Sequence, residues 1–185
     1  MKKEINKKVI MLGDGAVGKT SLIRRYVEDQ FKDDYIFTIG VKATRKDIPV
    51  KIGEDEIVVN MVIWDILGQT DYHRTQSEAF RGAAGALLVT DITRKETLES
   101  IGKYWVPQFE KEAGKVPVVL LANKADLKDQ MQFSEKELSN NAKNLGEPTK
   151  EKKVYLTSAK TGLNVEEAFQ ALAKGIARVW LSQQK

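Results

Sequence analysis

The chain has 185 residues, of which 42% are hydrophobic and 30% charged, and its formal net charge is +4. This size and composition predict one globular domain that buries roughly 70% of the surface of its unfolded chain. No apolar run approaches the ~20 residues of a membrane-spanning helix. The absence of cysteine excludes disulfides, thiolate metal sites, a cysteine nucleophile and lipid attachment to cysteine within this sequence.

The basic residues alternate with 26 acidic residues instead of forming blocks, which favours a solvated surface over a nucleic-acid interface. The first eight residues are basic, but they run into a strand-like segment without an apolar signal core or a cleavage site. We therefore expect a cytoplasmic protein that does not bind nucleic acid.

Strand-length apolar runs alternate with helix-length amphipathic segments along the chain, a pattern typical of a parallel sheet wound with helices. Gly53–Asp55 is too short a connection for a crossover helix and predicts an antiparallel hairpin. We predict an α/β fold of residues 1–185 as a single domain, with a six-stranded, mostly parallel sheet, one antiparallel strand and about five flanking helices. The predicted strands are residues 5–12, 41–51, 56–65, 84–90, 116–122 and 153–157, and the predicted helices are residues 20–28, 72–80, 95–112, 134–145 and 164–181.

The segment Gly13–Thr20, with the sequence GDGAVGKT, lies between the first predicted strand and the first predicted helix. Its small residues allow the backbone to curl round an anion, with N–H groups pointing inward and the positive end of the helix behind them. Lys19 would reach the terminal phosphates, and the Thr20 hydroxyl would bind Mg²⁺. A glycine-rich turn without a ligand is the alternative, and the strand-to-helix context argues against it.

The third predicted strand is followed by the sequence WDILGQ, in which Asp65 can hold Mg²⁺ through water and Gly68 can offer a backbone N–H to a γ-phosphate. Helix capping is the alternative role for Asp65. The polar connection of residues 33–40 is long enough to fold over a nucleotide, and the Thr38 hydroxyl would complete the Mg²⁺ shell.

The fifth predicted strand ends in Asn123-Lys124-Ala125-Asp126. A carboxylate accepts hydrogen bonds from N1–H and the N2 amine of guanine, whereas adenine presents a lone pair at N1, so Asp126 would select guanine. Lys124 can lie on the base or the ribose. Asn123 can tie this segment to the phosphate-binding segment Gly13–Thr20, which we call the phosphate loop. An ordinary turn is the alternative. Backbone N–H groups of Ser158, Ala159 and Lys160 would bind guanine O6 from the other side.

This ordered set of motifs, which spans essentially the whole chain, resembles the Ras superfamily of small GTPases and within it the Rab branch. The branch likeness comes from YIFTIGV at residues 35–41, from Trp64 before Asp65, and from FRGAAG at residues 80–85. The resemblance implies a P-loop NTPase fold, with Phe31 packed on the guanine edge and Tyr35 closing over the phosphates. The predicted nucleotide-binding residues are Gly15, Ala16, Val17, Gly18, Lys19, Thr20, Ser21, Phe31, Tyr35, Thr38, Gly68, Asn123, Lys124, Asp126, Ser158, Ala159 and Lys160.

The resemblance also implies slow hydrolysis of GTP, in which Gln69 orients the attacking water and Lys19 stabilises charge on the phosphates. Mg²⁺ would be held by Thr20, by Thr38 and, through water, by Asp65. No arginine is recognisable as a catalytic group in cis. Arg24 and Arg25 lie in the first predicted helix, and Arg74 lies in residues 65–80, which the resemblance identifies as the second switch, a segment expected to respond to the nucleotide. The intrinsic rate is therefore expected to be on the order of 10⁻⁴ to 10⁻³ per second.

The second switch, residues 65–80, departs from the Rab pattern, because Ile66, Leu67 and Thr70 replace Thr, Ala and Glu. A non-hydrolysing, GTP-bound scaffold is therefore an alternative, against which Gln69 argues. A small-molecule phosphotransferase built on the same loop is a second alternative, but no lid or acceptor pocket is recognisable in the sequence.

The expected partners are GTP and GDP, together with effectors, exchange factors and GTPase-activating proteins that would bind residues 33–41 and 65–80 of a monomer. A role in membrane traffic or signalling follows from the resemblance. Chains of this family usually end in a tail with cysteines for lipid, and this sequence ends without them. Peripheral membrane association is thus expected only through a tail absent here or through partners.

Overall fold

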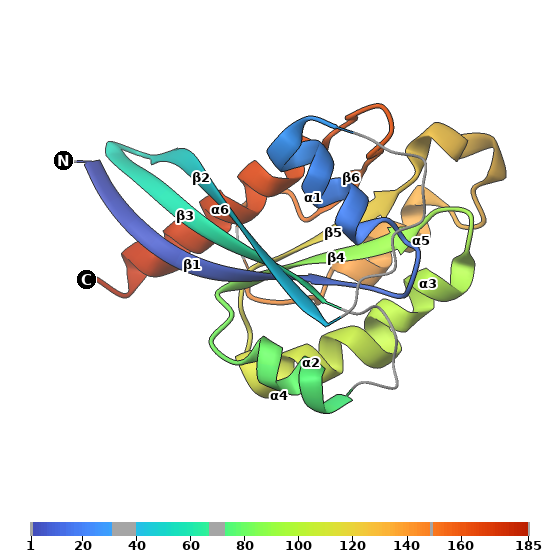
Figure 1. Cartoon of the computed structure of the whole chain (residues 1–185), viewed down its shortest axis with the longest axis horizontal. Coiled ribbons are helices and arrows are strands. Elements are labelled where there is room, and N and C mark those ends of the chain that lie inside the picture. Colours follow the sequence, from blue (N-terminus) through green and yellow to red (C-terminus); the bar gives the residue numbers. More distant parts are fainter. Residues whose placement is uncertain (1, 31–39, 67–72, 149, 185) are drawn as a thin grey trace.

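A computed structural model describes residues 2–30, 40–66, 73–148 and 150–184. These residues form a six-stranded sheet with the strand order β2-β3-β1-β4-β5-β6 and with helices on both faces (Figure 1). Neighbouring strands are parallel except β2 and β3, which form an antiparallel hairpin. The predicted fold class is thus confirmed. The strands are β1 (Lys2–Leu12), β2 (Val41–Ile52), β3 (Asp55–Ile66), β4 (Gly85–Asp91), β5 (Val118–Asn123) and β6 (Val154–Leu156).

The helices follow the prediction with one correction. The expected continuous helix of residues 95–112 is interrupted by the π-helical turn η1 (Ile101–Trp105), which separates α3 (Lys95–Ser100) from α4 (Val106–Ala113). A 3-10 helix, η2 (Ala125–Gln130), was not predicted. The other helices are α1 (Lys19–Glu28), α2 (His73–Phe80), α5 (Glu135–Ala142) and α6 (Val165–Ser182).

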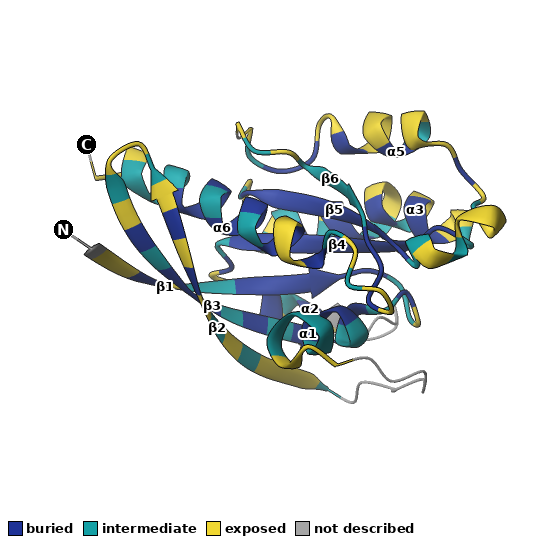
Figure 2. Ribbon diagram, turned by 90° about the horizontal axis from the view of Figure 1, so that it is seen from above, coloured by how far each residue is buried: buried dark blue, intermediate teal, exposed yellow. Residues whose placement is uncertain are grey.

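The core consists of two apolar layers, one on each face of the sheet. Side chains alternate along a strand, so Val9 and Met11 of β1 pack in one layer while Ile10 and Leu12 pack in the other. Helices α1 and α6 cover the first layer, and the helices from α2 to α5 cover the second. The central strands β4 and β5 are buried throughout, whereas the edge strand β2 is largely exposed (Figure 2).

The strand order places the loop after β1 at a topological switch point. The chain leaves β1 toward β2 and β3 on one side and later returns to build β4, β5 and β6 on the other. In open sheets of this kind, ligands bind outside the carboxyl ends of the strands at such a point. The segments after β1, β3, β4, β5 and β6 are therefore the candidates for a common site.

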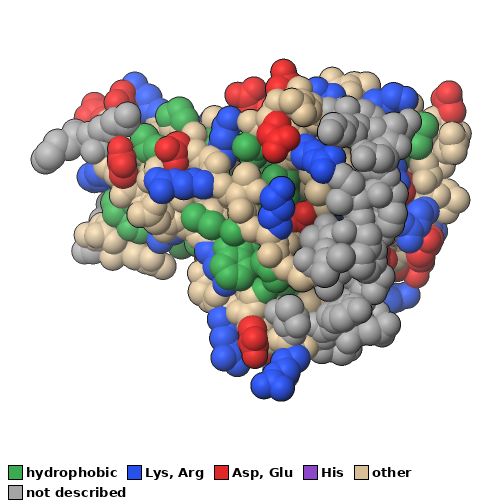
Figure 3. Space-filling model, viewed as in Figure 1, with side chains coloured by type: hydrophobic (Ala, Val, Ile, Leu, Met, Phe, Trp, Pro, Cys, Tyr) green, Lys and Arg blue, Asp and Glu red, His purple; other side chains and the backbone are tan. Residues whose placement is uncertain are grey.

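The surface carries mixed charge. On the face shown in Figure 3, lysine and arginine side chains are interspersed with aspartate and glutamate side chains. Among the helices that the structure describes, none combines the length and the apolar character needed to cross a membrane.

Candidate nucleotide-binding site

The loop between β1 and α1 has a backbone that two glycines make possible. Gly13 and Gly18 have φ angles of +146° and +103°, in the region that L side chains rarely adopt. A Cβ on Gly13 would lie 2.2 Å from the carbonyl oxygen of Val89 in β4. A Cβ on Gly18 would lie 2.3 Å from Nδ2 of Asn123. The loop is therefore packed closely against the ends of two neighbouring strands.

Lys19, the first residue of α1, is folded back over this loop. Its Nζ donates to the carbonyl oxygens of Gly13 at 2.7 Å and Asp14 at 2.9 Å, and its side chain is buried. Burial lowers the pKa of Lys19 to about 8, although the negative charges of Asp65 and Asp14 act in the opposite direction. An anion bound in the loop would stabilise the charged form of this ammonium group.

Thr20 and Asp65 bring two oxygen ligands together beside the loop. The Thr20 hydroxyl donates to Oδ2 of Asp65 at 2.5 Å, and Asp65 is buried at the end of β3. Hydroxyl and carboxylate oxygens fit Mg²⁺, which binds few protein groups and takes its remaining ligands from phosphates and water. The described residues contain no group of three or more His, Cys, Asp or Glu side chains arranged for a metal. Thr20 and Asp65 would hold Mg²⁺ only together with phosphate oxygens, water and the predicted ligand Thr38.

Asn123 connects the phosphate loop to the segments that follow β5 and β6. Its Nδ2 donates to the carbonyl oxygen of Val17 at 2.9 Å, and its Oδ1 accepts from the Thr157 hydroxyl at 3.2 Å. Both Asn123 and Thr157 are buried, so these hydrogen bonds are shielded from water. The tie between Asn123 and the phosphate loop is the one that the sequence predicted.

The two candidate base-binding segments lie against each other. The Ser158 hydroxyl donates to Oδ1 of Asp126 at 2.7 Å, and the Ala125 N–H donates to the Thr157 carbonyl at 2.9 Å. Ser158 is buried, whereas Asp126 is exposed at the start of η2. The hydroxyl therefore orients a carboxylate that faces solvent, where a ligand can reach it.

Arg25 of α1 supports this second segment, a contact that the sequence did not predict. Its Nε donates to the carbonyl oxygen of Ala159, and its guanidinium donates to that of Lys160, both at 2.7 Å. An ion pair with Asp29 at 3.3 Å holds the same guanidinium. The planar guanidinium thus spans two successive carbonyls and fixes the backbone from which Ala159 and Lys160 would donate N–H groups.

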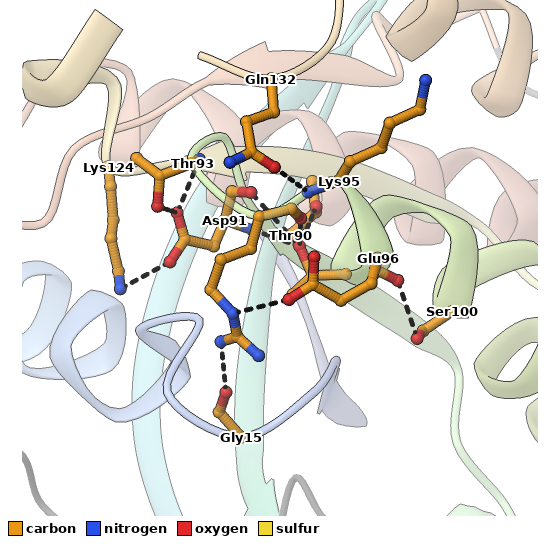
Figure 4. A network of polar contacts seen from close by, with 11 residues as sticks. Gly15, Thr90, Asp91, Thr93, Lys95, Glu96, Ser100, Lys124 and Gln132 are labelled. Carbon is orange, nitrogen blue, oxygen red and sulfur yellow. Dashed lines mark hydrogen bonds and ion pairs between the residues drawn. The ribbon is translucent and has the colours of Figure 1, made fainter. Parts of the chain in front are cut away.

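The segment after β4 joins the site as well, and Asp91 at the end of that strand is its centre (Figure 4). Its buried carboxylate lies 2.7 Å from Nζ of Lys124 and accepts from the Thr93 N–H and hydroxyl. Burial favours the neutral carboxyl, but the hydrogen bonds and charge of Lys124 and the Thr93 donors outweigh it and hold the pKa of Asp91 below its usual range. Asp91 therefore fixes the lysine expected to lie on the base or ribose.

Arg94, in the same segment, contacts the phosphate loop directly. Its guanidinium donates to the carbonyl oxygen of Gly15 at 3.0 Å and pairs with Glu96 at 3.1 Å. The segment after β4 thus connects the phosphate loop at Gly15 with the base-binding side at Lys124. In the sequence, Asp91 and Arg94 come soon after the predicted strand of residues 84–90, and this position was the signal that could have identified them.

Several predicted residues lie outside the described part of the chain. Phe31, Tyr35, Thr38, Gly68 and Gln69 are among them, and they stay predictions. The described residues Gly15, Ala16, Val17, Gly18, Lys19, Thr20 and Ser21 form the loop and the start of α1, and the segments after β5 and β6 carry the others.

Comparison with known proteins supplies the family. A sequence profile of the Ras family matches residues 8–178. The chain belongs to the Ras family. It is 36% identical over 183 residues to Ras-related protein Rab-7a of Dictyostelium discoideum, which covers 96% of this chain and 86% of that protein. It is 37% identical over 173 residues to the Ypt/Rab-type GTPase YPT7 of Saccharomyces cerevisiae, covering 90% and 79%. Human Rab-21 is 36% identical over 168 residues, covering 90% and 70%.

These relatives place the chain in the Rab branch of the small GTPases, as the sequence motifs had indicated. Membership in the Ras family also identifies the six-stranded sheet as a P-loop NTPase fold. The loop after β1 and the polar segments after β3, β4, β5 and β6 lie at the edge of the sheet where the sequence predicted the guanine-nucleotide site.

We predict that Asp91→Asn lowers the free energy of unfolding by about 1–2 kcal/mol at pH 7, because the substitution removes the charge paired with Lys124. The folded-state pKa of Asp91 is depressed, so its carboxylate stabilises the fold above the unfolded-state pKa of about 4. That contribution is lost as the pH falls through the folded-state pKa, so the difference from wild type should shrink below about pH 4.

Urea unfolding at pH 7 and at lower pH measures both effects. Asp129→Asn is the matched control, because Asp129 is an exposed carboxylate on η2. An Asp91→Asn protein as stable as wild type at pH 7 would contradict the role given to the Asp91–Lys124 pair.

Proposed function

We propose that this Rab-like protein is a guanine-nucleotide switch that binds GTP and GDP with Mg²⁺ and slowly hydrolyses GTP to GDP and phosphate. The observation that carries the proposal is the Asp126 carboxylate, oriented by Ser158 and joined through Asn123 and Thr157 to the phosphate loop. A carboxylate in this place suits guanine, and the loop suits phosphates. One nucleotide would engage both ends of the site.

Base selection would depend on Asp126 and on the backbone of Ser158, Ala159 and Lys160. The Asp126 oxygens accept from N1–H and the N2 amine of guanine, and adenine has no donor at N1. Arg25 supports the opposite wall by holding two of its carbonyls, so the N–H groups that would bind O6 are fixed before the ligand arrives. Such preorganisation increases affinity, because less ordering remains to be done on binding.

Phosphate binding and hydrolysis would depend on Lys19, the loop N–H groups and Gln69. Lys19 already lies over the loop, where its ammonium can stabilise charge on the β- and γ-phosphates. Thr20, Thr38 and, through water, Asp65 would hold Mg²⁺, which would neutralise negative charge on the phosphates. Gln69 would orient the attacking water.

Arg94 contacts the phosphate loop, and its contacts support a slow intrinsic rate. The guanidinium is bound to the Gly15 carbonyl and paired with Glu96, so reaching a γ-phosphate would require breaking both contacts. A rate on the order of 10⁻⁴ to 10⁻³ per second is expected without a catalytic arginine, and an arginine supplied by a partner would raise it.

The partners proposed for this switch are effectors, exchange factors and GTPase-activating proteins that bind residues 33–41 and 65–80. The Rab-7a, YPT7 and Rab-21 relatives favour a role in membrane traffic or signalling. A non-hydrolysing scaffold is the alternative that Leu67 keeps open, and single-turnover conversion of GTP distinguishes the two.

We predict that Asp126→Asn weakens GDP binding by at least about 100-fold, because two charge-assisted hydrogen bonds to guanine are lost or weakened. The same variant should gain affinity for xanthosine diphosphate, because an amide can donate to the xanthine oxygen. Titration with fluorescent GDP and competition with xanthosine diphosphate measure both. Equal GDP affinity in Asp126→Asn and wild type would refute guanine recognition by Asp126.

We predict that Gln69→Leu lowers single-turnover GTP hydrolysis on the order of tenfold or more while GTP stays bound, because the attacking water loses its orienting group. Gln130→Leu, at the exposed end of η2, is the control and should hydrolyse GTP like wild type. Hydrolysis at the wild-type rate in Gln69→Leu would remove Gln69 from the mechanism. A wild-type protein that leaves GTP unconverted would favour the scaffold instead.

A further inference from the structure

The π-helical turn η1 places two consecutive aromatic residues between the phosphate loop and the second switch. A π-turn contains one more residue than an α-helical turn and frequently occurs at functional sites. Tyr104 and Trp105 lie at its end, with their rings packed edge to face at 4.9 Å and 87°. Their polar atoms contact different elements, and the two contacts together suggest a role for the turn.

Trp105 contacts Asp14 of the phosphate loop. Its ring is fully buried, and its indole Nε1–H donates to Oδ1 of Asp14 at 2.7 Å. A buried indole N–H requires an acceptor, and a carboxylate acceptor makes a stronger hydrogen bond than a neutral one. This bond fixes the position of Asp14, the second residue of the phosphate loop, against the rigid core of the protein.

Asp14 in turn acts on Lys19, the residue that would bind the nucleotide phosphates. The Asp14 carbonyl accepts from Nζ of Lys19 at 2.9 Å, and the negative charge of the Asp14 side chain also stabilises the Lys19 ammonium. A shift of Asp14 would therefore change both the backbone on which Lys19 rests and the local charge. Trp105 would therefore act on a bound nucleotide through Asp14.

Tyr104 contacts the second switch. Its hydroxyl donates to Oε1 of Gln76 at 2.9 Å, and Gln76 is buried in α2 at 3% exposure. Helix α2 belongs to the predicted switch of residues 65–80. Adjacent residues of one turn thus hold the switch helix and the phosphate loop.

We propose that η1 links α2 to the phosphate loop, with Trp105 as a positioning residue for Asp14 and Lys19 and with Tyr104 as the contact that senses α2. This inference rests on the proposed nucleotide switch. It adds a set of contacts, from Gln76 through Tyr104 and Trp105 to Asp14, by which the second switch would affect nucleotide release. A movement of α2 shifts Tyr104, and the same rigid turn carries Trp105 and therefore Asp14.

The first test is the rate at which labelled GDP dissociates. Trp105→Phe keeps an aromatic ring but removes the donor to Asp14, so release should become faster on the order of tenfold. Asp14→Ala should have a similar effect, and the double variant should be no faster than either single one, because both remove the same hydrogen bond. Asp14→Asn keeps an acceptor oxygen and should release GDP more slowly than Asp14→Ala.

Trp180→Phe is the matched control, because Trp180 lies on the half-buried side of α6, and its release rate should equal that of wild type. Additive effects of Trp105→Phe and Asp14→Ala would show that the two residues act independently and would overturn the proposal. Unchanged release in Trp105→Phe would do the same.

The second test measures whether the nucleotide state changes the environment of Trp105. The indole N–H resonance of Trp105, assigned from its absence in Trp105→Phe, should differ between the GDP form and the form with a non-hydrolysable GTP analogue. Tyr104→Phe removes the hydroxyl group that donates to Gln76 and should reduce that difference by half or more, because the hydrogen bond between η1 and α2 is lost. An equal difference in Tyr104→Phe and wild type would overturn the link.

The two tests separate this inference from the function on which it rests. A wild-type protein that binds no labelled GDP would overturn the nucleotide switch and the link together. A wild-type protein that binds GDP, with release unaffected by Trp105→Phe, would overturn the link alone.

Discussion

The close approach of Asn123 to the phosphate loop is the contact on which the rest of the site depends. Its amide donates to the Val17 carbonyl and accepts from Thr157, so one buried side chain joins the loop after β1 to the segments after β5 and β6. The approach leaves no space for a Cβ at residue 18, and the φ angle of that glycine is one that other residues rarely adopt. A side chain at that position would therefore disturb the phosphate-binding and the base-binding sides together.

Three further sets of contacts join the segments at the same edge of the sheet, and we call them together the frame of the site. Asp91 holds Lys124, Arg94 holds Gly15, and Arg25 holds the carbonyls of Ala159 and Lys160. These contacts join elements that lie far apart in the sequence, and the parallel order of the strands is what brings them together. Because the contacts of this frame are already formed, we expect nucleotide binding to rearrange them little and to act mainly on the proposed switches, residues 33–41 and 65–80.

The sequence predicted the sheet, its antiparallel hairpin and the strand-to-helix loop, because hydrophobic periodicity and glycine spacing are local signals. It did not predict the π-turn, since the apolar pattern of residues 95–112 also fits a continuous helix. It missed the roles of Arg25 and Trp105, whose partners are 134 and 91 residues away. Asp91 could have been predicted, because ligands of such sheets bind at the carboxyl ends of the strands and Asp91 lies at one of these ends. The positions of Thr38 and Gln69 lie outside the described residues and remain predictions.

The identity of the nucleotide that co-purifies with the protein tests the central claim most directly. The account predicts that denaturing the purified protein releases GDP or GTP in close to equimolar amount, because Asp126 accepts from guanine and the phosphate loop holds the anion at the other end. Release of an adenine nucleotide would contradict guanine recognition by Asp126. A protein that releases no nucleotide and binds no added GDP would contradict the assignment of this edge of the sheet as a guanine-nucleotide site.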